Sequence, residues 1–319
     1  MPKSAVVGLF AAACLALSGC GGEIGEGSGE PRNFPGSDLG DVGNTTDLGD
    51  MGDTTDLGDV GNTTTPPGGT GPKPNASNTG PSNPGSLVPW PYGSTYLNTP
   101  GAVYENFTSS CLEIDADNVT LRNFIITCNG SYGIQQYNGR QGTLIEDGEI
   151  TGRLQSSGMY GQGFTARRLY IHHGEGDAIK MANRTPGLTL IEDSFVECMG
   201  VGVPEPHTDA VQIEAVVTHP GITFRGNNFD MPNTGTYPRP NCPTAAAASG
   251  IFTVTDGNTN ITVEGNWLNG GTYTIDVEAA GLDVINNLFG REYQYGVSRG
   301  NFGGAWTNNR WEDTLEIIP

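Results

Sequence analysis

The chain has 319 residues, of which 35 are acidic, 15 are basic and 49 are glycine, and its formal net charge is −20. This excess of negative charge argues against nucleic acid as a partner. After residue 90 there remain 25 acidic and 12 basic residues, so a polyanionic ligand would need a local basic patch or a bound cation.

The first twenty residues have the pattern of an export signal. Lys3 precedes an apolar run from Ala5 to Leu17, which is too short to remain as a membrane span. The following Leu-Ser-Gly-Cys, ending at Cys20, resembles the lipobox of bacterial lipoproteins, which implies cleavage before Cys20 and acylation of its thiol. We therefore expect an exported protein, lipid-anchored to the bacterial cell envelope or cell surface, with an ordinary signal peptide as the alternative.

Residues 21–87 are rich in Gly, Asp, Asn, Thr, Ser and Pro. They offer almost nothing to fill a core, so we expect a disordered tether, stiffened by prolines near its end. Within it the nonapeptide Asp-Leu-Gly-Asp-Val-Gly-Asn-Thr-Thr, beginning at Asp38, recurs with small changes from Asp47 and Asp56. A calcium-binding repeat array is the weaker interpretation, because three short turns cannot bury an apolar face by stacking.

Residues 88–319 carry a short repeat of an apolar strand followed by Asn or Asp. Successive markers are separated by 24, 21, 25, 34, 39, 21 and 22 residues, and they are Asn123, Asp147, Arg168, Asp193, Asn227, Asn266, Asn287 and Asn309. A period near 22 residues is typical of a parallel solenoid, in which each coil buries its apolar face only by stacking. We predict an all-β fold, a right-handed parallel β-helix of about eight coils.

A second series repeats in phase with the first. It places a small residue before an apolar one, as in Gly133-Ile134, Ala178-Ile179, Ala210-Val211 and Gly250-Ile251. A leucine-rich repeat is the structural alternative, but the helical half of its unit is missing.

Four cysteines remain once Cys14 and Cys20 are assigned to the leader and the anchor. In an oxidising compartment we expect them to form disulfides. Three pairings are possible, and the sequence-local one joins Cys111 to Cys128 and Cys198 to Cys242.

The two long spacings flank one coil and predict loops that wall a groove. Aligning the strand within this coil on its neighbour pairs Asp209 with Asp177 and Gln212 with Lys180, and places His207 beside Asp209. Two carboxylates this close either share a proton or hold a cation such as Ca²⁺. The alternative is that both aspartates only accept hydrogen bonds from turn amides.

Further residues extend this hypothetical groove. Tyr160 and Phe252 are predicted to lie on the outward row, where aromatic rings suit stacking on sugars, and Arg184 and Arg291 are candidate substrate contacts. The pair His172-His173 is predicted to cap a coil rather than to bind metal.

The coil pattern, together with Gly-Asp-Ala-Ile-Lys (176–180) and His-Thr-Asp-Ala-Val-Gln (207–212), resembles the secreted β-helix proteins of the pectate-lyase-like superfamily. The resemblance implies activity on polysaccharides, most often cleavage of uronic-acid chains by β-elimination. A lyase must neutralise the uronate carboxylate and remove the C5 proton. In this assignment Asp177 and Asp209 hold Ca²⁺, and Lys180 or His207 serves as the base. Neighbouring carboxylates raise the pKa of Lys180, so His207 is the better base, and Lys180 binds substrate together with Gln212.

Other functions start from the same residues. The segment from Glu205 to Asp209 is loosely similar to the Asp-Pro-His motif of alginate C5-epimerases, and His207-Thr208-Asp209 is similar to the Asn-Thr-Asp of polygalacturonases, whose other motifs are missing here. The non-enzymatic alternative is a surface module that binds an anionic glycan, or has a structural role, without turnover. In either case we expect a monomer.

Overall fold

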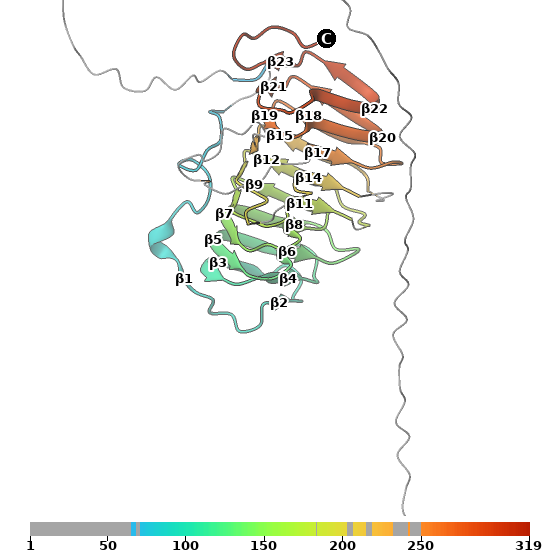
Figure 1. The fold of residues 1–319 in the computed structure, drawn as a ribbon. Coiled ribbons are helices and arrows are strands. Elements are labelled where there is room, and N and C mark those ends of the chain that lie inside the picture. The colour runs from blue at the N-terminus through green and yellow to red at the C-terminus, as the bar shows by residue number, and fades with distance from the viewer. Residues whose placement is uncertain are drawn as a thin grey trace, which may run out of the picture. The chain divides into compact units, whose positions relative to one another are not determined.

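The computed structural model describes residues 65–67, 71–182, 184–202, 207–214, 219–231, 242 and 250–319. These residues form 23 strands, and every pairing between strands is parallel. Coil stacks on coil from the N-terminal to the C-terminal end of the body (Figure 1). The chain is a right-handed parallel β-helix, as predicted. Among the described residues no helix is long and apolar enough to cross a bilayer.

The strands stack into three sheets that run along the body. The first sheet contains β2 (Tyr96–Leu97), β4 (Leu112–Ile114), β6 (Tyr132–Gln136), β8 (Ser157–Tyr160), β11 (Asp177–Met181), β14 (Asp209–Ile213), β17 (Gly250–Val254) and the first parts of β20 (Tyr273–Ile285) and β22 (Gly296–Thr307). The second contains the first parts of β3 (Val103–Ser109), β5 (Thr120–Cys128) and β7 (Thr143–Gly152), then β9 (Phe164–Arg167), β12 (Thr189–Glu192), β15 (Ile222–Arg225), β18 (Ile261–Glu264) and the last parts of β20 and β22.

The third sheet completes each coil. It contains β1 (Val88–Pro89), the last parts of β3, β5 and β7, then β10 (Tyr170–His172), β13 (Phe195–Glu197), β16 (Asn228–Met231), β19 (Trp267–Gly270), β21 (Leu288–Phe289) and β23 (Arg310–Trp311).

Side chains of like kind stack along the axis and form the core. In the first sheet one row of apolar residues is fully buried and in register, namely Ile134, Met159, Ile179, Val211, Phe252 and Ile275. Each member covers the one below, so burial of one coil depends on its neighbours.

A turn with left-handed backbone separates the second sheet from the third. Its residues include Asn123, Asp147, Arg168 and Asp193 in the early coils, and Gly226, Gly265, Asn286 and Asn308 later. In the later coils the predicted asparagine marker is the next residue, which is buried. The side chains of these four asparagines bond from coil to coil at 2.9–3.1 Å, in the order Asn227, Asn266, Asn287 and Asn309. They satisfy backbone groups that the turn would leave unpaired.

Opposite charges alternate along the outer face of the second sheet. In register from coil to coil they are Glu105, Arg122, Glu146, Arg167, Glu192, Arg225 and Glu264. Buried Glu146 binds Arg122 at 2.8 Å, Arg167 at 2.7 Å and Arg168 at 2.9 Å. This ladder was not recognised from the sequence, and it takes up three of the arginines of the body.

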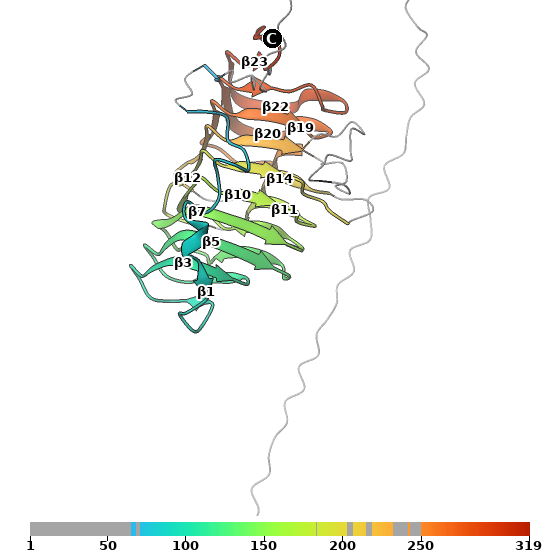
Figure 2. The ribbon, with the colours of Figure 1, turned by 90° about the vertical axis from the view of Figure 1, so that its left-hand side faces the viewer.

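Residues 71–87 correct the predicted linker boundary. Lys73 binds Glu312 at 2.6 Å, Asn228 donates to the carbonyl oxygen of Pro74 at 2.8 Å, and the amide of Asn83 donates to Asn123 at 2.8 Å. The segment therefore lies along the body from its last coil to its first, against the direction of coiling (Figures 1 and 2). Its backbone polar groups find partners on the β-helix, which composition cannot reveal. The predicted leader, Cys20 and the nonapeptides lie outside the described residues.

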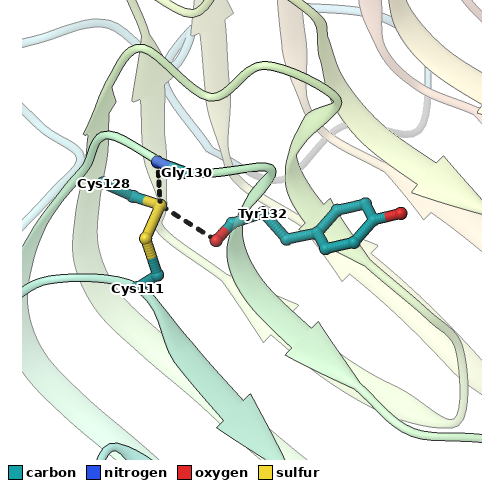
Figure 3. Close-up of a disulfide and its surroundings, with 4 residues drawn as sticks. All are labelled: Cys111, Cys128, Gly130 and Tyr132. Carbon is teal, nitrogen blue, oxygen red and sulfur yellow. Dashed lines mark hydrogen bonds between the residues drawn. A yellow bond between two sulfur atoms is a disulfide. The ribbon is translucent and has the colours of Figure 1, made fainter.

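Both predicted disulfides are present, Cys111–Cys128 and Cys198–Cys242. In the first, the Sγ atom of Cys128 accepts a hydrogen bond from the amide of Gly130 and lies 3.0 Å from the carbonyl oxygen of Tyr132 (Figure 3). This disulfide fixes the turn that leads into β6.

Candidate functional site

The outer face of the first sheet carries a continuous row of polar and aromatic side chains. Its members are in register and are Tyr96, Glu113, Gln135, Tyr160, Lys180, Gln212, Thr253, Asp276 and Arg299. Adjacent parallel strands are about 4.8 Å apart, so the row offers one side chain at each such step. The predicted pairing of Lys180 with Gln212 is confirmed.

Asp177 and Asp209 begin β11 and β14 and lie beside this row. The register is the same on both sides of Ala178 and Ala210, since Asp177 pairs with Ser157 and Asp209 with Gly250. The side chain of Asp209 reaches the outer row, because its Oδ1 atom accepts a 2.9 Å hydrogen bond from the hydroxyl of Thr253.

The two aspartates are joined through the backbone. The amide of Asp209 donates to Oδ1 of Asp177 at 2.9 Å, and both side chains are buried, at 4% and 2% exposure. Burial and the charge of Asp209 raise the pKa of Asp177 to about 7. Burial also raises the pKa of Asp209 to about 6, although hydrogen bonds from Thr253 and the amide of Gly250 oppose the rise. The pair therefore retains protons close to neutral pH.

Both interpretations of the pair can be compared with this geometry. Each carboxylate accepts a backbone amide of the next coil, as the turn-bonding interpretation expects. Among the described residues no group of three or more His, Cys, Asp or Glu side chains could hold a metal ion. Ca²⁺ prefers six to eight oxygen ligands, so the two aspartates alone do not fit it, and Ca²⁺ stays a prediction. Ser157 lies opposite Asp177, and its hydroxyl is fully buried with no hydrogen-bond partner in the described part of the chain.

Lys180 is held as a cation. Its Nζ atom lies 2.8 Å from Oε1 of Glu214, and 21% of its side chain is exposed. Burial opposes its charge, but the hydrogen bond and attraction of Glu214, followed by Asp177, raise the pKa of Lys180. Lys180 is thus a poor resting base, in agreement with the role of substrate contact.

Two tyrosines adjoin Lys180. The rings of Tyr132 and Tyr160 pack with centroids 4.5 Å apart, and Tyr132 begins the strand that the Cys111–Cys128 disulfide fixes. Burial raises the pKa of Tyr160, so its phenol remains protonated at neutral pH. Tyr160 is on the outer row, as predicted.

His207 and Gln212 complete the group. His207 is exposed, and its charge when protonated lowers the pKa of Asp209, so the two side chains interact electrostatically. Gln212 is half-buried, and its Oε1 atom is buried without a hydrogen-bond partner among the described residues. Of the two loops predicted to wall the groove, residues 203–206, 232–241 and 243–249 lie outside the described part of the chain.

Phe252 was predicted on the outer row, and this assignment is wrong. Its side chain is fully buried and packs against Phe224 and Phe229 at centroid distances of 4.9 and 5.2 Å. The sequence predicted that Ile251 pairs with Val211, but the partner of Val211 in the structure is Phe252, so the predicted register is wrong by one residue. A slip of one residue exchanges the faces of a strand, so Thr253 takes the outer position.

The two candidate arginines do not belong to the row. Arg184 is exposed after β11, where its backbone pairs with Asn138 and Gly139. Arg291 follows β21 of the third sheet, binds Asp313 at 2.7 Å and stacks 4.0 Å from the ring centroid of Trp311. Arg291 thus lies near the C-terminus, apart from the outer row, and its role as a substrate contact stays a prediction.

Sequence reasoning missed the C-terminal end of the row. Arg299 binds Asp276, and its guanidinium lies 4.9 Å from the ring centroid of Tyr273. The repeat period could have located Asp276 and Arg299 on the row, but only once Thr253 and not Phe252 is taken as the outward residue of β17. His172 also differs from a simple cap: its ring nitrogens contact His173 and Glu149.

Comparison with known proteins finds no matching family model, no matching curated protein and no matching solved structure.

Proposed function

We propose that this chain is a lipid-anchored surface protein of the pectate-lyase-like group that cleaves a uronic-acid polysaccharide by β-elimination at the outer face of the first sheet. The observation that carries the proposal is the juxtaposition of exposed His207 with a buried, proton-retaining carboxylate pair, beside Lys180 and Tyr160.

The chemistry divides among these residues as follows. Lys180 and the amide of Gln212 bind the uronate carboxylate, which stabilises the charge that develops when the C5 proton leaves. His207 takes the C5 proton. The electron pair of the C5–H bond then forms the C4–C5 double bond while the C4–O4 bond breaks. Tyr160, which is protonated at neutral pH, supplies a proton to the departing O4. Asp177 binds the amide of Asp209, and Asp209 interacts electrostatically with His207, so the two buried aspartates position the base.

Export and anchoring are part of the same proposal. Two disulfides in a body of this size are typical of an oxidising compartment. In this proposal the N-terminal leader is the export signal and Cys20 is the acylation site.

The test is ultraviolet absorbance of the unsaturated uronate product, with the full chain and a panel of pectate, alginate and glucuronan, in the presence and absence of Ca²⁺. We expect an increase that His207→Ala abolishes without loss of glycan affinity. His173→Ala, which changes a histidine directly after β10 of the third sheet, is the matched control and should retain turnover. Absence of any product from all three polymers would reject the lyase.

A binding module without turnover is the second candidate. It is favoured by the ion pairs Lys180–Glu214 and Arg299–Asp276, which satisfy both cations of the outer row before any ligand arrives. This candidate predicts glycan binding by the wild type with unchanged polymer length and unchanged C5 configuration.

A further inference from the structure

A second column of residues runs beside the outer row of the first sheet, along the first residues of its strands. The register pairs each member with the next, and the two aspartates are joined through the amide of Asp209. From β6 to β20, strands that stack on one face of the body (Figure 1), the column consists of Tyr132, Ser157, Asp177, Asp209, Gly250 and Tyr273.

The column has a tyrosine at each end and the carboxylate pair at its centre. Adjacent parallel strands are about 4.8 Å apart, so the five steps from Tyr132 to Tyr273 span about 24 Å. The residues between the pair and the tyrosines are Ser157 and Gly250, so no large side chain of the column separates the acids from either ring.

A further aromatic ring accompanies each of these tyrosines. Tyr132 packs on Tyr160 beside Lys180, as described above. Tyr273 packs on Tyr295 with ring centroids 5.7 Å apart, and the side chain of Tyr295 is 66% exposed. The amide of Tyr295 donates to the carbonyl oxygen of Thr272 at 2.8 Å, which holds Tyr295 next to Tyr273.

Arg299 completes the group at the C-terminal end. Its guanidinium lies 4.9 Å from the ring centroid of Tyr273 and binds Asp276. After burial, the charge of Asp276 also raises the pKa of Asp209, so this group interacts electrostatically with the carboxylate pair. We call Tyr273, Tyr295 and Arg299 the distal platform.

We infer that the distal platform is a second sugar-binding subsite, which holds the same glycan chain that lies against Tyr132 and Tyr160, so that one chain follows the axis across the carboxylate pair. The inference rests on the proposed function in taking a uronan as the ligand. Sugar rings offer an apolar face to tyrosine, and Arg299 with Asp276 offers a donor and an acceptor to their hydroxyls. Stacking needs no positive charge, which suits an acidic body.

A chain that contacts both ends should bind much more tightly than a fragment that reaches only one, because its second contact is intramolecular. The experiment is calorimetric titration with a disaccharide and an octasaccharide prepared from pectate, alginate and glucuronan. The full chain carries His207→Ala so that bound sugars stay intact, and the wild type replaces it for any uronan that gives no product. We expect the octasaccharide to bind at least about tenfold more tightly than the disaccharide.

Tyr295→Ala and Tyr273→Ala should each raise the dissociation constant of the octasaccharide at least about tenfold, since buried aromatic contacts dominate binding. Tyr293→Ala is the matched control, because Tyr293 stacks on Trp311 away from the row, and it should leave this constant unchanged. Tyr295 is exposed, so Tyr295→Ala should melt at the same temperature as its parent. Hydrogen exchange should show that the octasaccharide protects both 132–135 and 295–299.

The outcomes separate this inference from the proposed function. An octasaccharide that binds no more tightly than the disaccharide, or binds Tyr295→Ala as well as its parent, would overturn the distal subsite, while product formation would still support the lyase. Tight binding that depends on Tyr295, without product, would reject the lyase and keep the subsite. Absence of binding to all three uronans would reject both.

Discussion

The amide of Asp209 donates a 2.9 Å hydrogen bond to Oδ1 of Asp177 across two stacked coils, although 32 residues separate them in the chain. Each aspartate is thus both a strand residue and a bridge to the next coil. This bond places two buried carboxylates at the centre of the outer row, where their protons are coupled to the stability of the fold.

The first prediction concerns pH. The pKa of Asp177 rises from 3.8 to about 7 on folding, so the native state binds its proton more tightly than the unfolded chain. Its stabilising contribution is therefore complete below pH 3.8 and is lost as pH rises to about 7. Asp177→Asn should remove this dependence, which is on the order of 3 kcal/mol, in urea unfolding at pH 4 and pH 8. Equal pH slopes in wild type and variant would contradict it.

A second prediction isolates the cation of the row. Glu214→Gln removes the partner of Lys180 and frees its ammonium group for an anionic ligand. Calorimetric titration with oligogalacturonate should show affinity raised by about threefold to tenfold at low salt, with the gain reduced by added salt. Glu264→Gln removes a similar charge on the second sheet and should leave affinity unchanged.

The corrected register makes a third prediction. Phe252→Ala should lower the free energy of unfolding by about 3–5 kcal/mol, because it leaves a cavity between Phe224 and Phe229. Thr253→Val, one residue later, should cost less than this and should instead alter the pH dependence linked to Asp209, whose hydrogen bond it removes. If Thr253→Val proved the more damaging change, the assignment of faces would be wrong.

A fourth prediction tests the charge ladder. Glu146 is bound by three arginines, and Glu146→Gln should destabilise the fold by about 3 kcal/mol at neutral pH. Despite burial, these arginines lower the pKa of Glu146, so its contribution is present above the ordinary Glu pKa and disappears as pH falls. Thermal melts should show the gap between wild type and variant closing in acid. Glu105→Gln, at the exposed end of the ladder, should cost less than about 1 kcal/mol.

The fifth prediction concerns residues 71–87. The side chain of Asn123 binds both the amide and the carbonyl of Asn83, and also Ser86 and Asn106. Asn123→Ala should accelerate proteolysis and hydrogen exchange within 71–87, while the amides of β11 and β14 remain protected. Uniform loss of protection across the body would show instead that this residue supports the whole fold.

The sequence alone determined the architecture, because a parallel solenoid repeats its chemistry at every coil. The period near 22 residues predicted the fold, and the stacking of Asp177 with Asp209 and of Lys180 with Gln212 followed from aligning two coils of similar sequence. The two disulfides also agreed with the sequence-local pairing.

Only the tertiary structure decided which side chains face outward where the coils differ in length. One slipped residue moved Phe252 into the core and placed Thr253 on the row, because successive side chains of a strand point to opposite faces. Likewise, the position of Arg291 on the third sheet, the charge ladder of the second sheet and the contacts of 71–87 depend on groups far apart in the chain. Local composition carries no record of such partners, and the burial that raises the pKa of Asp177 exists only once neighbouring coils cover it.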